Sequence, residues 1–352
     1  MDKHNGLHVN TLYLEITDKC NYSCKYCYNR SCASNKKYLS NDAFQRAVTC
    51  FSHWGLKAIT YSGGEPLLHP GLKAFLDYGQ THNVSQLIIT NGSMLNEEWC
   101  DYVRKNNILL QFTMDGSSES INDFTRGKGA YTATIAALEL IQRAELSNRL
   151  IMRYNISYFN QADIEDFVRF ISRYKIRRIE FSLVMANGRG QNFECIDKIT
   201  NSELIRELNQ RIVCISESEG IHASLINNDI SLACPIQLGG NGLRVKIDSM
   251  GNIYPCQSLF GKEFALCNIY DDVFDYCVFA DCFNKYAKRL SELNFVGTEC
   301  FRCRYHKLCR GSCIADTVQY TQLGMCEQLC ATRKASYYEH LLNSLRRRRT
   351  SD

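Results

Sequence analysis

The hydrophobic and polar positions of this chain alternate between two periods from Thr11 onward. Runs typical of strands lie at 11–17, 57–62, 86–90, 108–114, 149–156 and 178–184. Runs with helical spacing lie between them, at 40–54, 72–82, 97–105, 131–145 and 164–174. Ser40 is placed to cap the first of these helices, and Gly55 to end it. Strands that alternate with helices in this way predict a parallel sheet with right-handed crossovers.

Unusual residues follow the first four predicted strands. In parallel α/β proteins the active site lies at the carboxyl ends of the strands. The segments found there are Cys20–Cys27, Ser62-Gly63-Gly64-Glu65-Pro66, Asn91-Gly92 and Asp115-Gly116. We therefore expect the functional site at this edge of the sheet.

Composition narrows the class of protein. The 352 residues are 45% hydrophobic and 22% charged, with a formal net charge of +4, as in ordinary globular enzymes. Four arginines, 346–349, hold much of the basic excess and are interpreted as a solvated tail, so no nucleic-acid partner is expected. No signal peptide or membrane-spanning run is found, which predicts a cytoplasmic protein with no membrane contact. Nineteen cysteines in such a protein indicate metal binding rather than disulfides.

Three cysteines, Cys20, Cys24 and Cys27, lie on one short loop after the first strand. Most iron–sulfur clusters have four cysteine ligands, so three would leave one iron open for chemistry. The alternative is a zinc loop, which normally pairs C-x2–4-C units and adds a fourth ligand. The nearest further thiol, Cys32, is five positions on.

The C-x3-C-x2-C spacing, with the aromatic Tyr26 before the last cysteine, resembles the signature of radical S-adenosylmethionine (SAM) enzymes. The resemblance implies a [4Fe–4S] cluster whose open iron is chelated by SAM. It also implies reductive cleavage of SAM to a 5′-deoxyadenosyl radical. The fold it implies is α/β, a partial (β/α)6 TIM-like barrel, which the six predicted strand–helix units match.

Further segments resemble motifs of the same family. Ser62-Gly63-Gly64-Glu65 resembles its GGE motif, and glycine suits a close approach to a ligand or a positive φ. Thr113 takes the place of serine in an S-x-D-G segment, and a guanidinium such as that of Arg126 can pair bidentately with the SAM carboxylate. An ordinary surface role for Arg126 and an ordinary polar role for Asn155 stay open. The implied SAM contacts are Tyr26, Ser62, Gly63, Gly64, Glu65, Asn91, Thr113, Arg126 and Asn155.

The cysteine pattern returns near the C-terminus. Its members are Cys234, Cys256 within G-x4-C, the run Cys300, Cys303, Cys309 and Cys313, and then Cys326 and Cys330. The order resembles the SPASM extension of radical SAM enzymes, which binds two auxiliary iron–sulfur clusters, commonly [4Fe–4S]. A zinc knuckle is the alternative reading of the four-cysteine run alone.

By resemblance, Cys234, Cys256 and Cys313 hold the first auxiliary cluster. Cys300, Cys303 and Cys309 hold the second, closed by Cys330 in preference to Cys326. The fourth ligand of the first cluster is left open between a vacant site, Cys267, Cys326 and a residue other than cysteine.

Four regions are expected. Residues 1–190 form the radical SAM barrel, 191–230 a linking helix region, and 231–334 the SPASM region with a β-hairpin. Residues 335–352 form a C-terminal helix and basic tail.

The resemblance implies an oxidoreductase that modifies a peptide or protein, with a thioether or C–C cross-link in a ribosomally made precursor as the first hypothesis. Formylglycine formation, as in anaerobic sulfatase maturases, is the runner-up, although Gln257 stands where those enzymes carry an aspartate. Small-molecule chemistry and a non-enzymatic zinc protein are the other readings. The expected electron donor is a flavodoxin or ferredoxin. Because about ten residues precede the first strand, a leader peptide is expected to be recognised by a separate leader-peptide-binding protein, by another surface of this chain, or not at all.

Overall fold

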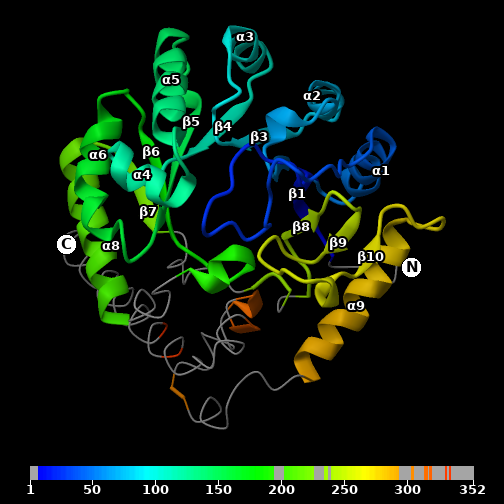
Figure 1. Ribbon diagram of the computed structural model, residues 1–352. Coiled ribbons are helices and arrows are strands. Elements are labelled where there is room, and N and C mark those ends of the chain that lie inside the picture. The colour runs from blue at the N-terminus through cyan, green and yellow to red at the C-terminus, as the bar shows by residue number, and fades with distance from the viewer. Residues whose placement is uncertain are drawn as a thin grey trace, which may run out of the picture.

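The computed structural model describes residues 7–193, 202–225, 234–236, 239–292, 303–304, 313–315, 317–318, 330 and 333. Its main feature is a single sheet in the order β10-β9-β8-β1-β2-β3-β4-β5-β6-β7 (Figure 1). The strands are β1 (Val9–Thr17), β2 (Ala58–Gly63), β3 (Ser85–Thr90), β4 (Leu109–Thr113), β5 (Leu150–Ile156), β6 (Arg178–Leu183), β7 (His222–Leu225), β8 (Leu243–Ile247), β9 (Asn252–Tyr254) and β10 (Cys267–Asn268).

Neighbouring strands from β8 through β7 are parallel, and β9 and β10 are added antiparallel. The helices are α1 (Asn41–Ser52), α2 (Leu72–Thr81), α3 (Glu97–Lys105), α4 (Glu119–Arg126), α5 (Ala130–Arg143), α6 (Ile164–Ser172), α8 (Ser202–Glu219) and α9 (Tyr276–Glu292). Short 3-10 turns are η1 (Pro66–Leu68), η2 (Ser147–Arg149), η3 (Gln161–Asp163), η4 (Gly188–Asn192) and η6 (Lys262–Phe264).

The core lies between the sheet and the helices that surround it. Side chains on the outer face of the strands, such as Leu14, Phe112 and Tyr154, are fully buried there. Ser40 begins α1 as predicted, since its hydroxyl accepts a hydrogen bond from Ala43 N at 3.1 Å. Burial of this apolar face is what fixes each helix against its strand.

The sheet curves so that its other face is enclosed. Gln111 on β4 donates a hydrogen bond to Glu180 on β6 at 2.7 Å, across the intervening strand β5. The curved sheet confirms the predicted α/β fold with a parallel barrel, and Figure 1 shows the helices on its outer side.

Two features go beyond the predicted topology. Helix α8, expected as a link, is followed by β7, which pairs parallel with β6 and continues the alternation. The predicted hairpin at 243–254 forms as β8 and β9, but β8 also pairs parallel with β1. The region boundaries stay predictions, and residues 335–352 lie outside the described part of the chain. Among the described helices, none has the length and apolar character needed to cross a membrane.

Candidate active site

The loop with Cys20, Cys24 and Cys27 follows β1 and is held by two distant segments. Lys25 N donates to Thr125 O of α4 at 2.8 Å. Arg189 of η4 donates from Nε to Cys24 O at 2.8 Å and from its backbone N to Cys27 O at 3.0 Å. The loop therefore has a defined shape at the carboxyl end of the sheet, where the sequence predicted it.

The three thiols are half-buried and influence one another. Burial, together with smaller effects of the Glu65, Cys24 and Cys27 groups, raises the pKa of Cys20 to about 12. Burial also raises the pKa of Cys24, while the Arg126 guanidinium opposes that shift. Metal binding must release these thiol protons, because thiolates are the ligands. No group of three or more His, Cys, Asp and Glu side chains in the described ranges is arranged to hold a single metal ion.

Gly63 and Gly64 are required by the protein backbone that crosses them. Gly63 has φ +121°, and a Cβ there would lie 2.2 Å from Thr17 O. A Cβ on Gly64 would lie 2.0 Å from Lys19 O. The predicted positive φ is present at Gly63. The close approach is to the start of the cysteine loop, so the two glycines let that loop cross the end of β2.

The side chains of Glu65 and Asn91 form hydrogen bonds to other groups of the protein. The Glu65 carboxylate is fully buried and accepts from Leu67 N at 3.0 Å, Thr90 Oγ1 at 2.6 Å and Asn91 N at 2.8 Å. Asn91 Nδ2 donates to Asn21 Oδ1 of the cysteine loop at 2.8 Å. These bonds join the ends of β2 and β3 to the loop. Any SAM contact made at Glu65 is left to its backbone.

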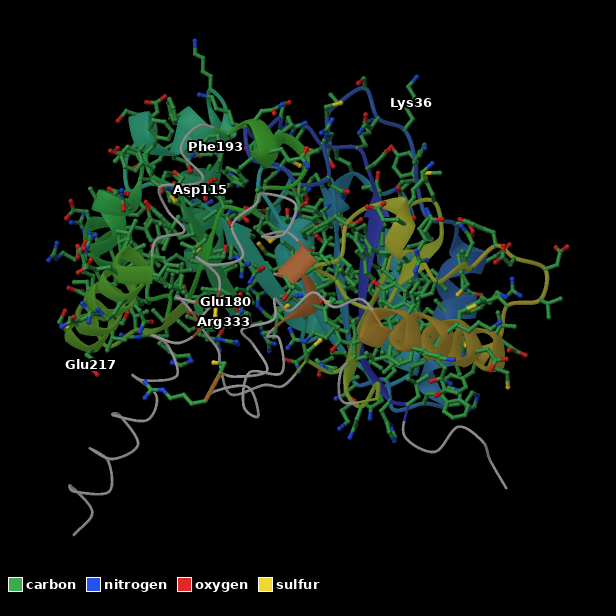
Figure 2. All side chains as sticks on the ribbon, turned by 90° about the horizontal axis from the view of Figure 1, so that it is seen from below. Lys36, Asp115, Glu180, Phe193, Glu217 and Arg333 are labelled. Carbon is green, nitrogen blue, oxygen red and sulfur yellow. The ribbon has the colours of Figure 1, made fainter. Side chains whose placement is uncertain are left out.

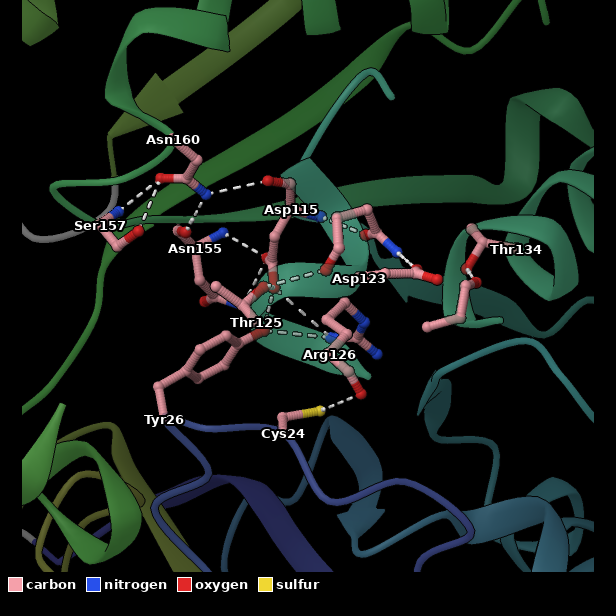
Figure 3. A network of polar contacts seen from close by, with 12 residues as sticks. Cys24, Tyr26, Asp115, Asp123, Thr125, Arg126, Thr134, Asn155, Ser157 and Asn160 are labelled. Atoms are coloured by element: carbon pink, nitrogen blue, oxygen red, sulfur yellow. Dashed lines mark hydrogen bonds and ion pairs between the residues drawn. The ribbon is translucent and has the colours of Figure 1, made fainter. Parts of the chain in front are cut away.

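Tyr26, Arg126 and Asn155, all predicted SAM contacts, meet in one network with Asp115 (Figure 3). The Tyr26 hydroxyl donates to Asp115 and accepts from Arg126 Nη1 at 3.1 Å and Asn155 Nδ2 at 3.0 Å. Phe193 packs edge-on against Tyr26, with ring centroids 6.4 Å apart. Asp115 and Phe193 are both labelled in Figure 2, within the same crowded region of side chains.

Arg126 is not the surface residue that was the alternative, because it is only 5% exposed. Its Nε is buried and has no hydrogen-bond partner among the described residues. A buried guanidinium N–H without a partner is costly unless a ligand completes it. The free Nε and the adjacent three-thiol loop therefore fit SAM and a cluster. The Cys24 thiol donates a hydrogen bond to the backbone carbonyl of Arg126, with Sγ 3.9 Å from O. Cys24 therefore lies next to the residue that carries the guanidinium.

Ser62 and Thr113 lie at the ends of β2 and β4. Ser62 Oγ accepts a hydrogen bond from Tyr13 OH at 2.9 Å. Thr113 is half-buried. Their strand-end positions agree with the predicted edge.

A buried carboxylate on the inner face of β1 was missed at the sequence level. Glu15 is 3% exposed, is paired in register with Ser62, and its Oε1 has no hydrogen-bond partner among the described residues. Burial raises the pKa of Glu15, the Lys246 ammonium lowers it, and Asp248 raises it. A glutamate in the middle of a parallel sheet is the signal that could have found it, since such strands are usually apolar throughout.

The C-terminal cysteines are described only in part. Cys234 and Cys256 lie near each other, since the Cys234 thiol adds to the effect of burial in raising the pKa of Cys256. Cys267 instead lies near Cys282 and Cys50, and burial raises its pKa to about 12. Cys303, Cys313 and Cys330 are half-buried cysteines. Cys300, Cys309 and Cys326 lie outside the described residues, so both auxiliary ligand sets stay predictions.

The sequence is similar to those of known proteins. Residues 14–171 match the family described as the radical SAM superfamily. The mycofactocin maturase MftC of Mycobacterium ulcerans (strain Agy99) is 22% identical over 308 residues, which are 86% of this chain and 82% of that protein.

Solved structures give the same fold. "Native anSMEcpe with bound AdoMet and Cp18Cys peptide" has a TM-score of 0.71 and 18% identity, and the match covers 96% of this chain and 98% of that chain. Streptococcus suis SuiB "bound to precursor peptide SuiA" has a TM-score of 0.70 and 16% identity, with 89% and 74% covered. With the three-thiol loop and the buried arginine, these matches show that residues 14–171 are a radical SAM domain and that the chain is an enzyme that uses SAM with a [4Fe–4S] cluster.

Proposed function

We propose that this enzyme oxidatively modifies a peptide or protein, by installing a thioether or C–C cross-link in a ribosomally made precursor peptide. The single observation that carries the proposal is the meeting of the cysteine loop with Arg126 at the carboxyl end of the sheet, where Arg126 Nε has no partner among the described residues. Peptides are named with two of its structural relatives, anSMEcpe and SuiB. When bound, the cluster and SAM supply a radical that abstracts hydrogen from the substrate.

The residues of the chain would bind and orient the cluster and SAM, and would exclude water from the site. Cys20, Cys24 and Cys27 would hold the cluster, and Arg126 would pair with the SAM carboxylate. Tyr26 and Asn155, which belong to the same network as Arg126, would position SAM. The backbone at Gly63 and Gly64 keeps the loop close to β2.

Glu15 is the group that we assign to accept a proton from the substrate. Its carboxylate is buried on the inner face, beside the predicted cofactor residue Ser62, and Oε1 lacks a partner within the described residues. Forming a cross-link removes two hydrogens from the substrate. The radical takes one as a hydrogen atom, and the other leaves as a proton and an electron, so a base and an electron acceptor, such as a predicted auxiliary cluster, are both needed. Gln257 has an amide, which cannot take this proton.

The cofactor assignment is tested with Cys24→Ala and the matched control Cys32→Ala. Cys32 is a nearby half-buried thiol outside the triad. After anaerobic reconstitution, iron and sulfide are assayed, and 5′-deoxyadenosine is measured after incubation with SAM and dithionite. We expect Cys24→Ala to lose at least about 100-fold in SAM cleavage and Cys32→Ala to keep it. A colourless, zinc-loaded protein, or full cleavage by Cys24→Ala, would overturn the assignment.

The substrate is tested by co-expression with each short reading frame that neighbours the gene. A product lighter by two hydrogen atoms and resistant to thiol alkylation supports a thioether. Loss of the cysteine sulfur would instead indicate formylglycine. The proposal includes a cytoplasmic location, a flavodoxin or ferredoxin as reductant, and a separate protein that binds the leader of the precursor. Pull-down of the precursor with and without neighbouring proteins tests the last of these.

A further inference from the structure

Asp115 is a fully buried carboxylate that joins three separate parts of the site (Figure 3). Its Oδ2 accepts from the Tyr26 hydroxyl of the cysteine loop and from Thr125 Oγ1 of α4 at 3.1 Å. Its Oδ1 accepts from Asn155 of β5, from the backbone N at 3.0 Å and from Nδ2 at 3.3 Å. The sequence placed Asp115 only in a turn after β4, with no role of its own.

The same carboxylate also holds Arg126. Arg126 Nη1 lies 3.9 Å from Asp115 Oδ2 and donates to the Tyr26 hydroxyl, which in turn donates to Asp115. Asp115 thus interacts with Arg126 both directly, as an ion pair, and through the Tyr26 hydroxyl. Because Asp115 and Arg126 are exposed by 0% and 5%, removing one charge leaves the other buried without compensation.

The backbone of Asp115 is fixed as well, so the carboxylate has little freedom to move. Asp115 N donates to Asn122 Oδ1 at 3.0 Å, and Asp115 O accepts from Asn160 Nδ2 at 2.9 Å. A carboxylate held at its backbone and at both oxygens can fix the groups that donate to it. Those groups are Tyr26, next to the ligand Cys27, and Arg126, whose Nε has no partner in the described part of the chain.

We propose that Asp115 is a positioning residue that fixes the SAM-carboxylate anchor, Arg126, to the cluster-bearing loop through Tyr26. It acts through these side chains and does not itself contact SAM. The inference rests on the proposed pairing of Arg126 with the SAM carboxylate. Its consequence is that the affinity for the carboxylate of SAM depends on Asp115, a residue in the loop after β4.

The test compares the binding of SAM with that of decarboxylated SAM to the reconstituted protein by equilibrium dialysis. Asp115→Asn keeps the shape and removes the charge. We expect it to weaken SAM binding by about 10- to 100-fold but to change binding of decarboxylated SAM much less. The matched control is Asp123→Asn on α4. Among the described residues, its carboxylate accepts local hydrogen bonds from Gly129 N, Tyr131 N and Asn122 Nδ2. This control should keep the wild-type ratio of the two affinities.

Two further variants separate the possible failures. If Arg126→Gln leaves the ratio of affinities unchanged, the pairing of Arg126 with the carboxylate is wrong. If Arg126→Gln lowers the ratio but Asp115→Asn does not, only the positioning role of Asp115 is overturned. Tyr26→Phe combined with Asp115→Asn should lose less affinity than the sum of the two single changes, because both act on one network. Full additivity would also contradict the proposal.

Discussion

The two faces of the barrel strands differ sharply in chemistry, although both are enclosed. The outer face carries apolar side chains such as Phe112 and Phe181, which are fully buried under helices. The inner face carries Glu15, Arg153 and Glu180. The outer face follows the ordinary rule that apolar groups are buried, and the inner face departs from it at a cost in stability.

The departure shows which face serves stability and which serves chemistry. A charged group held away from water is retained where it has a task, since natural proteins tolerate such losses mainly at functional sites. The cysteine loop and the Asp115 network lie at the carboxyl end of the same strands, so polar groups on the inner face are placed near the expected ligand. Three substitutions compare the two faces directly, beginning with the largest expected effect.

Phe112→Ala removes a fully buried ring from the outer face of β4, where Phe112 also lies against Gly92. We expect a loss of about 3–5 kcal/mol in the free energy of unfolding, from lost burial and the cavity left behind. Urea denaturation measures it. The neighbouring inner-face change Thr113→Ala serves as the control and should cost less than about 1 kcal/mol. Equal losses for the two variants would remove the distinction between the faces.

Glu15→Gln tests the cost of the inner-face carboxylate. Burial raises the pKa of Glu15 above its ordinary value of 4.5, so the folded state binds this proton more tightly than the unfolded state. Stability from this group is therefore present at low pH and is lost as the pH rises through the folded pKa. We expect Glu15→Gln to be more stable than wild type by about 1 kcal/mol near neutral pH.

Thermal unfolding at several pH values checks this expectation. Lys246 is the nearby cation, and Asp248, Tyr13, Tyr28 and Tyr254 are other titratable groups near Glu15. The gain should shrink as the pH falls toward 4.5, the ordinary value for glutamate. A variant that is less stable than wild type at neutral pH would show that Glu15 is satisfied in the folded protein. That result would weaken its assignment as a proton acceptor.

Glu180→Gln should have the smallest effect. The Arg153–Glu180 pair, at 3.1 Å, has side chains 25% and 30% exposed, so solvent screens it. Gln111 can still donate to the amide oxygen of the new side chain. We expect a change of about 0.5 kcal/mol or less in urea denaturation. A loss of several kcal/mol would show that the inner face also carries stability.

The parts of the fold that the sequence predicted well depend on local patterns. The alternation that predicted strands around Leu14 and Phe112, and the cap at Ser40, are set by near neighbours in the chain. The cysteine loop is a compact motif, and its C-x3-C-x2-C spacing carries the resemblance to radical SAM enzymes. These features needed no knowledge of what packs against them.

The features that were missed depend on contacts between distant segments. The role of Asp115 requires Tyr26, 89 positions earlier, and Asn155, 40 positions later. Glu15 alternates with apolar residues and so resembles a solvent-facing position, and only the curvature of the sheet encloses it. The pairing of β8 with β1 joins residues more than 200 positions apart, and no local pattern encodes a partner strand.

That pairing has a consequence for protein engineering. Leu12 through Leu14 pair in register with Val245 through Ile247. The strand β8 is therefore part of the barrel sheet, and the C-terminal region is not joined to the barrel by a linker alone. A chimera that exchanges this region between relatives must preserve the residue register of the β1–β8 pairing. A register shift of one residue would turn Lys246 away from Glu15 and toward the apolar outer face of the sheet.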